Sequence, residues 1–258
     1  MAVRARSSTP AVHGAPVRER IADISETSYA SATPRRLDWR HERPRTGLLR
    51  AHSSALPAAR AIAMSCDHFI CASTPFVTQV IPEQQWPEGF RFDGEDRAYW
   101  SERTCGLACL MSIASFHGKP VPAIFELLQE GVRLGHYTNR GWIHAGLAAL
   151  GETYGFQGKA LPALTIDDLH FCLEFTGSPL IASVTRQFPE DGRRGGHLVV
   201  VTAVDNGPMP RICCRDPAGG GMRESRISAA RFFASFAGRI IVFPRLHRQE
   251  TVVSSERR

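Results

Sequence analysis

Three side chains that lie far apart in the sequence have the types that nucleophilic catalysis requires. Cys105 stands directly before a glycine in RTCGLACL, at the start of an apolar run. His197 follows two glycines in GGHLVVV, and Asp216 precedes a proline in CCRDPAGG. A thiolate can attack a carbonyl carbon, an imidazole can carry the proton, and a carboxylate can orient the imidazole. These residue types raise the hypothesis of a Cys–His–Asp relay.

The elements predicted around these residues favour the same hypothesis. The run CGLACLMSIASFHGK is typical of a buried helix of about three turns that ends at Gly118. A thiol in its first turn lies where unpaired backbone N–H groups and the helix dipole favour the anion. HLVVVTAVD and RICCRDP are typical of strands, and Asn206-Gly207 between them is a hairpin signal. Such a hairpin brings residues 197 and 216 to the same end of adjacent strands.

The remaining segments predict a fold in which helices come first and strands follow. Three more helices are expected in the runs at 121–135, 142–155 and 167–177, and two more strands at 179–185 and 239–243, the latter closing the sheet. This order indicates an α+β fold. In it, a helical half that contains the nucleophile helix packs on an antiparallel β-sheet.

Each chemical interpretation has a structural alternative. A cysteine before a buried helix is most often a small apolar filler, and Asp-Pro is an ordinary turn. Cys109, one turn beyond Cys105, is expected to be a core residue rather than a redox partner. The seven cysteines are expected to be reduced. No metal site is expected, because Cys66 and Cys71 are too widely spaced for a zinc knuckle and a second pair is lacking.

The positive charge is concentrated at the N-terminus. Residues 1–63 contain eleven arginines against five acidic residues, which accounts for the whole formal net charge of +6. Because a nucleic-acid-binding domain should carry its charge on the folded part, no nucleic-acid partner is expected. The same segment is rich in Ala, Arg, Ser and Pro, so we expect disorder there, and also in 246–258. The composition changes at Met64, and we hypothesise that the native product begins there, with one domain over 64–245.

The chain has no segment that predicts a membrane location. No run reaches the ~18 apolar residues that a spanning helix needs. The N-terminus MAVRARSSTPAVHGAPVRER lacks the compact apolar segment of a signal peptide. We therefore expect a cytoplasmic protein without a membrane partner. No cofactor is expected.

Four runs, in order, resemble one known family. They are TCGLACLMSIASFHGK, GWIHAGLAAL, GGHLVVVTAVD and RDPAGG, and together with their surroundings they span residues 75–243. They resemble the C39-like branch of the papain-like cysteine peptidases, which includes double-glycine leader peptidases. The resemblance implies a papain-like fold with Cys105 as nucleophile, His197 as base and Asp216 as the residue that orients it. It further implies cleavage of a peptide or amide bond through a thioester, here as a standalone protein without a fused transporter.

One departure from the family concerns the oxyanion. Members usually carry a glutamine about six residues before the nucleophile, whereas this chain has Tyr99 there, followed by Trp100. Losing such a donor can cost ~10²–10³ in rate. The hydroxyl of Tyr99, the indole N–H of Trp100, or an upstream amide (Gln84 or Gln85) is expected to substitute, with the backbone N–H of Cys105 as the second donor.

Four further residues are expected to line the substrate cleft, namely Trp142, His144, Gly195 and Gly196. The predicted activity is that of a cysteine peptidase or amide hydrolase that matures a peptide or a bacterial peptide natural product. Two alternatives stay open. The same triad would serve an amide-forming or cyclising acyltransferase, and the departure at the oxyanion donor would fit a catalytically silent peptide-binding homologue.

Overall fold

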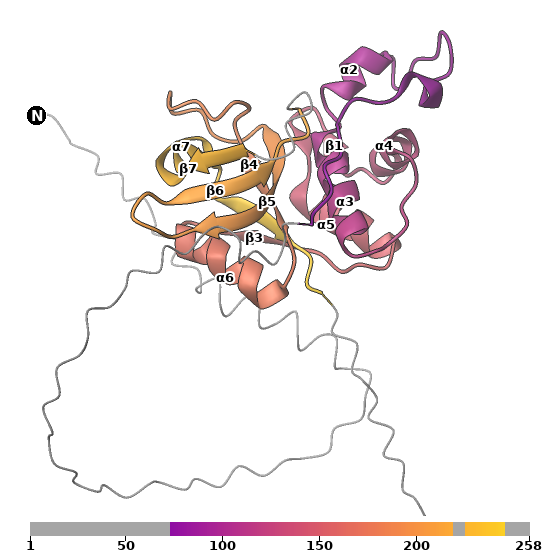
Figure 1. Ribbon diagram of the computed structural model, residues 1–258. Coiled ribbons are helices and arrows are strands. Elements are labelled where there is room, and N and C mark those ends of the chain that lie inside the picture. Colours follow the sequence, from indigo (N-terminus) through magenta and orange to yellow (C-terminus); the bar gives the residue numbers. More distant parts are fainter. Residues whose placement is uncertain (1–72, 219–224, 246–258) are drawn as a thin grey trace, which may run out of the picture.

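The computed structural model describes residues 73–218 and 225–245, which form a helical lobe and a sheet lobe (Figure 1). The helical lobe comes first in the chain, and the sheet lobe follows. The predicted α+β class, with helices packed on an antiparallel sheet, is confirmed. The segment 1–63, Met64, Cys66, Cys71 and the tail 246–258 lie outside the described residues.

The helical lobe is built around one buried helix. Its elements are η1 (Glu83–Gln85), α2 (Arg97–Ser101), α3 (Cys105–Phe116), α4 (Ile124–Arg133) and α5 (His144–Thr153), with a hairpin of β1 (Tyr137–Thr138) and β2 (Gly141–Trp142). Helix α3 contacts α4, α5 and the sheet, and most of its residues are buried. Because small and apolar side chains surround its whole circumference, this helix can pack on several sides at once.

Two glycines let an aromatic side chain approach α3 closely. A Cβ atom on Gly106 would lie 3.0 Å from the ring of Trp142, and one on Gly131 would lie 2.7 Å from the same ring. The indole therefore fills a slot between α3 and α4. Its Nε1 donates to the backbone carbonyl of Arg103 at 2.7 Å. This contact holds the hairpin β1–β2 against the start of α3.

The sheet lobe contains a six-stranded antiparallel sheet with the order β3-β8-β4-β5-β6-β7. Its strands are β3 (Lys159–Pro162), β4 (Leu180–Val184), β5 (His197–Asp205), β6 (Arg211–Arg215), β7 (Ser225–Ser228) and β8 (Arg239–Val242). The last strand was expected to close the sheet, but it lies inside it, between β3 and β4. The hairpin of β5 and β6 is confirmed, although residues 206–210 form its loop rather than Asn206-Gly207 alone.

The sheet is covered on both faces, which explains its continuous apolar strands. Leu198 and Val200 of β5 face the core shared with α3, and Val199 and Val201 face a second core. Helices α6 (Ile166–Thr176) and α7 (Ala229–Ser235) pack against the second core. A strand buried on both faces needs apolar residues at every position. Nearly all of β5 is accordingly buried.

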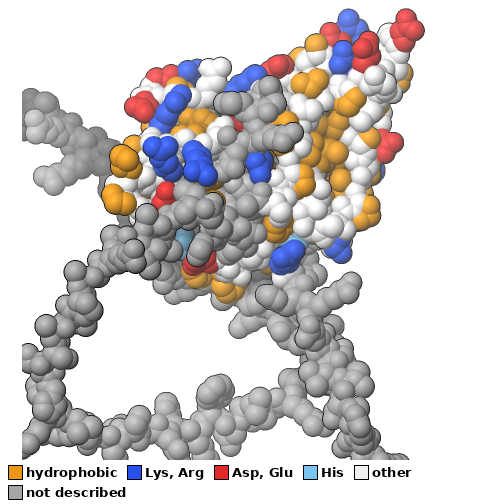
Figure 2. Space-filling view, in the orientation of Figure 1, with side chains coloured by type: hydrophobic (Ala, Val, Ile, Leu, Met, Phe, Trp, Pro, Cys, Tyr) orange, Lys and Arg blue, Asp and Glu red, His pale blue; other side chains and the backbone are white. Residues whose placement is uncertain are grey.

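The four helices predicted at 105–118, 121–135, 142–155 and 167–177 are confirmed as α3 to α6. Strands β3 and β7 and the short helices α2 and α7 were not predicted. Within residues 73–218 and 225–245, no helix has the length and apolarity to cross a bilayer. Figure 2 shows hydrophobic side chains over the helical lobe and a group of Lys and Arg side chains over the sheet lobe.

Candidate active site

Cys105 is the first residue of α3 and lines a cavity between the two lobes. The preceding residue, Thr104, donates its hydroxyl to the carbonyl of Gln79 at 2.5 Å. As the first helical residue, Cys105 precedes the intrahelical hydrogen-bond ladder, where backbone N–H groups and the dipole favour an anion. Its side chain is 7% exposed and borders a cavity of about 130 Å³. The thiol is therefore both protected and reachable.

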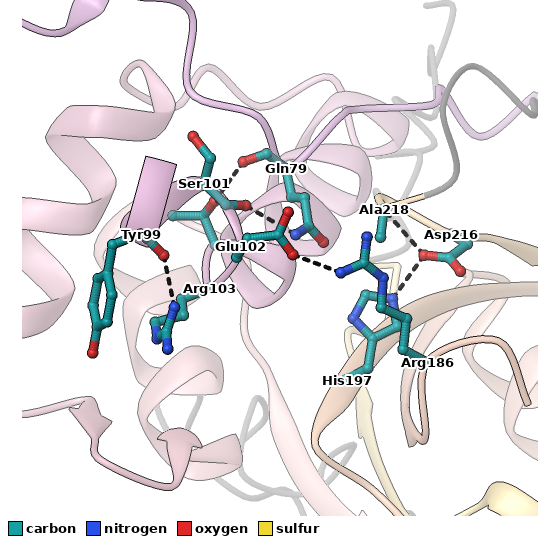
Figure 3. Close-up of polar contacts among 10 residues, drawn as sticks. Gln79, Tyr99, Ser101, Glu102, Arg103, Arg186, His197, Asp216 and Ala218 are labelled. Atoms are coloured by element: carbon teal, nitrogen blue, oxygen red, sulfur yellow. Dashed lines mark hydrogen bonds and ion pairs between the residues drawn. The ribbon is translucent and has the colours of Figure 1, made fainter. Parts of the chain in front are cut away.

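His197 and Asp216 come from neighbouring strands of the sheet lobe. His197 opens β5, and Asp216 directly follows β6, whose last residue pairs with Val200. The Nε2 atom of His197 lies 2.7 Å from Oδ1 of Asp216, and that oxygen also accepts from the backbone N–H of Ala218 at 2.9 Å (Figure 3). Because an ionised carboxylate only accepts, Nε2 must carry a proton. The ring nitrogen left for another partner is Nδ1.

The thiol of Cys105 is the second partner of the imidazole. Burial alone would lower the pKa of His197. Hydrogen bonds with Asp216 and with Cys105, together with the charges of both, outweigh burial and raise the pKa to about 9. Burial acts to raise the pKa of Asp216, but the hydrogen bond and charge of His197 hold it below its usual value. The site therefore favours a protonated ring between two acidic groups.

Most of the residues predicted to form the cleft line this cavity. Trp142, His144 and Gly196 border it together with Cys105 and His197. Gly195 is not among the residues that line it. A second cavity of about 630 Å³ shares Arg140, Gly141, Trp142 and His144 with the first. The two cavities are therefore neighbours, one at the thiol and the other along β3 and β8, and together they are called the cleft below.

The predicted oxyanion donors lie elsewhere. The indole N–H of Trp100 donates to the carbonyl of Phe92 at 2.8 Å, so the prediction for this residue is wrong. The ring of Tyr99 packs against the guanidinium of Arg103, 3.5 Å from its carbon, and Tyr99 does not border the cavity. Gln84 is exposed in η1, and its neighbour Gln85 also lies outside the cavity lining.

A glutamine that sequence reasoning missed lies beside the start of α3. Gln79 is 3% exposed, and its Nε2 donates to the carbonyl of Ser101 at 2.9 Å (Figure 3). Its backbone carbonyl accepts from Thr104, and its backbone N–H donates to Pro217, the residue after Asp216, at 3.0 Å. Gln79 therefore links the nucleophile helix to the acidic residue. Residues 82–101, which contain η1 and α2, separate Gln79 from Cys105 in the sequence, so the glutamine that lies beside the nucleophile is not the residue about six positions before it.

One ion pair spans the lobes next to this site. The Nη1 atom of Arg186, which follows β4, lies 2.6 Å from Oε2 of Glu102, which follows α2 (Figure 3). Both side chains are about half exposed. The charge of Arg186 also contributes to the low pKa of Asp216.

The second cysteine of α3 cannot replace the first. Cys109 is fully buried, and burial, followed by the charge of Cys105, raises its pKa well above the usual value. Within the described ranges, no group of three or more His, Cys, Asp and Glu side chains could hold a metal ion.

A scan against protein-family models and a search of curated proteins found no match. Solved structures do resemble the chain. The peptidase domain of Streptococcus ComA, described as a bi-functional ABC transporter in a quorum-sensing pathway, is 21% identical, with a TM-score of 0.46 over 66% of this chain and 98% of that one. A double-glycine-motif protease from an AMS/PCAT transporter, solved with its leader peptide, is 20% identical, with a TM-score of 0.37 over 54% and 82%. UfSP from C. elegans is 14% identical, with a TM-score of 0.38 over 55% and 29%. At these values the likenesses carry no conclusion about activity.

Proposed function

We propose that this chain is a cysteine hydrolase that cleaves a peptide or amide bond. The observation that carries the proposal is the contact series from Asp216 through the imidazole of His197 to the thiol of Cys105, beside a cavity of about 130 Å³. The raised pKa of His197 favours an imidazolium beside the sulfur. A thiolate paired with an imidazolium is an activated nucleophile, and it holds the proton that a leaving amine needs.

The reaction proceeds in two halves. The thiolate of Cys105 forms a C–S bond to the substrate carbonyl, and the C–N bond then breaks as Nδ1 of His197 gives its proton to the leaving amine. Water next attacks the thioester while neutral His197 takes its proton. Breakage of the C–S bond releases the carboxylic acid and restores the thiolate and the imidazolium. Asp216 orients the ring and stabilises its charge throughout.

Two donors are available to the oxyanion in this proposal. The first is the backbone N–H of Cys105, at the helix start. The second is the amide of Gln79, which bonds to the segment directly before Cys105 although it is not among the residues that line the cavity. Its Nε2 has two N–H groups, of which the carbonyl of Ser101 accepts one. Burial and the contacts of Gln79 with Thr104 and Pro217 support this role, because a fixed donor stabilises developing charge better than a mobile one.

Hydrolysis is the outcome that the cleft favours over acyl transfer. Transfer to an amine requires that water be kept from the thioester. Here Cys105 is 7% exposed, and the cavity that it borders shares four lining residues with a larger one. Maturation of a peptide or peptide natural product remains part of the proposal on the strength of the sequence resemblance.

The test is product analysis by mass spectrometry. The full chain and its Cys105→Ala variant are incubated with a diverse peptide mixture, with and without an added amine. We expect cleaved peptides with the wild-type chain only, and free acids as the main products even when amine is present. Amide products would establish a transferase, and intact peptides that nevertheless co-purify with the chain would establish a silent binder.

A further inference from the structure

The cleft beside Cys105 carries an excess of positive charge. Arg103 lines the inner cavity, Arg239 lines the outer one, and Arg140 lines both. The one carboxylate among the lining residues is that of Glu102, which is paired with Arg186 at 2.6 Å. The field of the cleft therefore comes mainly from three arginines. Clefts lined by one sign of charge concentrate ligands of the opposite sign.

None of these three arginines forms an ion pair with a carboxylate in the described part of the chain. Arg193, outside the cleft, pairs with Asp191 at 2.7 Å. The described residues that line the two cavities therefore leave the positive charge of the three arginines without an acidic partner. This arrangement fits a cleft that receives its negative charge from the substrate.

Contacts with Tyr99 fix the position of the Arg103 guanidinium at the edge of the inner cavity. The guanidinium stacks on the ring of Tyr99 at 3.5 Å, and its Nη1 donates to the Tyr99 carbonyl at 2.9 Å. The hydroxyl of Tyr137 lies near enough for the positive charge of Arg103 to counter, in part, the effect of burial, which raises the pKa of Tyr137. A guanidinium has five N–H groups, so donors remain after these contacts. A stacked guanidinium loses little further freedom when it binds a carboxylate.

The region between the inner and outer cavities has one more donor. His144 lines both cavities, and its Nε2 atom is buried without a hydrogen-bond partner. Burial, followed by the charge of Arg239, lowers the pKa of this imidazole, so the ring is neutral near pH 7. A neutral imidazole can donate one hydrogen bond without adding charge.

We propose that the cleft selects acidic peptides, with carboxylates close to the scissile bond that are held by Arg103, Arg140 and Arg239. This inference rests on the proposed function and adds a substrate class to it. The inner cavity of about 130 Å³ has room for a small residue beside the thiol. The outer cavity of about 630 Å³ has room for acidic side chains near Arg140 and Arg239.

The test compares two alkylating reagents that differ in charge. Iodoacetate and iodoacetamide modify the same sulfur, but only iodoacetate carries a carboxylate. Rates of modification at Cys105 are measured by peptide mass spectrometry near pH 7 for the full chain and for the variants R103Q, R140Q, R239Q and R140Q/R239Q. His197 attracts iodoacetate equally in every variant, so differences between variants report on the arginines.

We expect the ratio of the iodoacetate rate to the iodoacetamide rate at Cys105 to be about tenfold lower in the double variant than in the wild-type chain. The control Arg193→Gln, outside the cleft, should change neither rate. About 1 M salt, where the Debye length is about 3 Å, should remove most of the wild-type preference for iodoacetate. Arg140 and Arg239 are exposed, so the double variant gives the result even if R103Q does not fold.

Equal ratios of the two rates in the wild-type chain and the double variant would overturn the acidic-substrate inference and leave the hydrolase proposal standing. Failure of iodoacetamide to modify Cys105 would overturn the hydrolase proposal, and the inference with it.

Discussion

His197 occupies a position in which two neighbours stabilise its proton. Asp216 contacts one ring nitrogen at 2.7 Å, and the thiol of Cys105 interacts with the ring from the second lobe. Because these interactions raise the pKa of the ring from 6.5 to about 9, the folded protein binds this proton more tightly than the unfolded chain does. The resulting stabilisation is fully present below pH 6.5 and is lost as the pH rises through about 9.

The first prediction concerns this proton. The kcat/KM of the wild-type chain should fall as the pH rises through about 9, because neutral His197 cannot protonate the leaving amine. Asp216→Asn removes a carboxylate that raises the pKa, so its alkaline limb should move toward neutral pH. A pH–rate profile on one peptide checks this. Asp191→Asn, at an exposed site outside the cleft, is the control and should keep the wild-type limb, whereas an unmoved limb in Asp216→Asn would contradict the role of Asp216.

The second prediction concerns Gln79. Gln79→Ala should lower kcat by about 10²–10³ through loss of an oxyanion donor. It should also lower the free energy of unfolding by about 1–3 kcal/mol, because the carbonyl of Ser101 loses its buried partner. Kinetics and thermal unfolding separate the two effects. Gln84→Ala, at an exposed glutamine nearby, should change neither, and a kcat of wild-type size in folded Gln79→Ala would exclude the donor role.

At the scale of elements, the site depends on how α3 meets the hairpin β1–β2. Trp142 packs on Gly106, the residue after the nucleophile, and its indole N–H holds the carbonyl of Arg103, two residues before it. The first turn of α3 is thus fixed from both sides. This contact explains why a glycine follows the cysteine.

The third prediction tests that packing. A Cβ atom on Gly106 would lie 2.8 Å from Cδ1 of Leu147 and 3.0 Å from the ring of Trp142. Gly106→Ala should therefore lower the free energy of unfolding by about 1–3 kcal/mol and reduce kcat by displacing Cys105. Ser115→Ala, on the exposed face of the same helix, should stay within about 0.5 kcal/mol of the wild type. Denaturant unfolding gives both values, and equal stabilities would show that the slot tolerates a methyl group.

The long elements could be predicted from the sequence, because burial on both faces leaves continuous apolar runs in β5 and around α3. The edge strands β3 and β7 could not, since each is four residues long and contains polar residues or proline. Cys105, His197 and Asp216 lie at ends of predictable elements, so their meeting could be anticipated. The position of Gln79 beside α3 could not be anticipated, because it depends on the path of the segment that contains η1 and α2, and the sequence of that segment has no clear periodicity. Trp100 was misjudged because its indole N–H bonds locally to Phe92.

At the scale of the whole molecule, the site lies between two lobes that each supply part of it. The helical lobe contributes the thiol, and the sheet lobe contributes the imidazole and the carboxylate. The Gln79 segment and the pair of Glu102 and Arg186 connect the lobes at this point. Because both side chains of that pair are about half exposed, the pair should contribute only about 0–1 kcal/mol to stability.

The fourth prediction follows from the charge of the cleft. Glu102→Gln removes its one lining carboxylate and should raise kcat/KM for acidic peptides, whereas Arg186→Gln should lower it. Both variants break the same ion pair, so their small losses in thermal stability should be similar. Opposite shifts in kcat/KM, measured with paired Glu- and Gln-containing peptides, would distinguish charge from stability. Shifts of the same sign would show that the pair acts only as a link between lobes.

The central claim, that Cys105 is activated by His197, is tested most directly by the rate at which iodoacetamide modifies each cysteine near neutral pH. The account predicts that Cys105 reacts much faster than buried Cys109, and that His197→Gln slows Cys105 at least tenfold by removing the partner of the thiolate. Equal, slow modification of both cysteines, or an unchanged rate in His197→Gln, would contradict it.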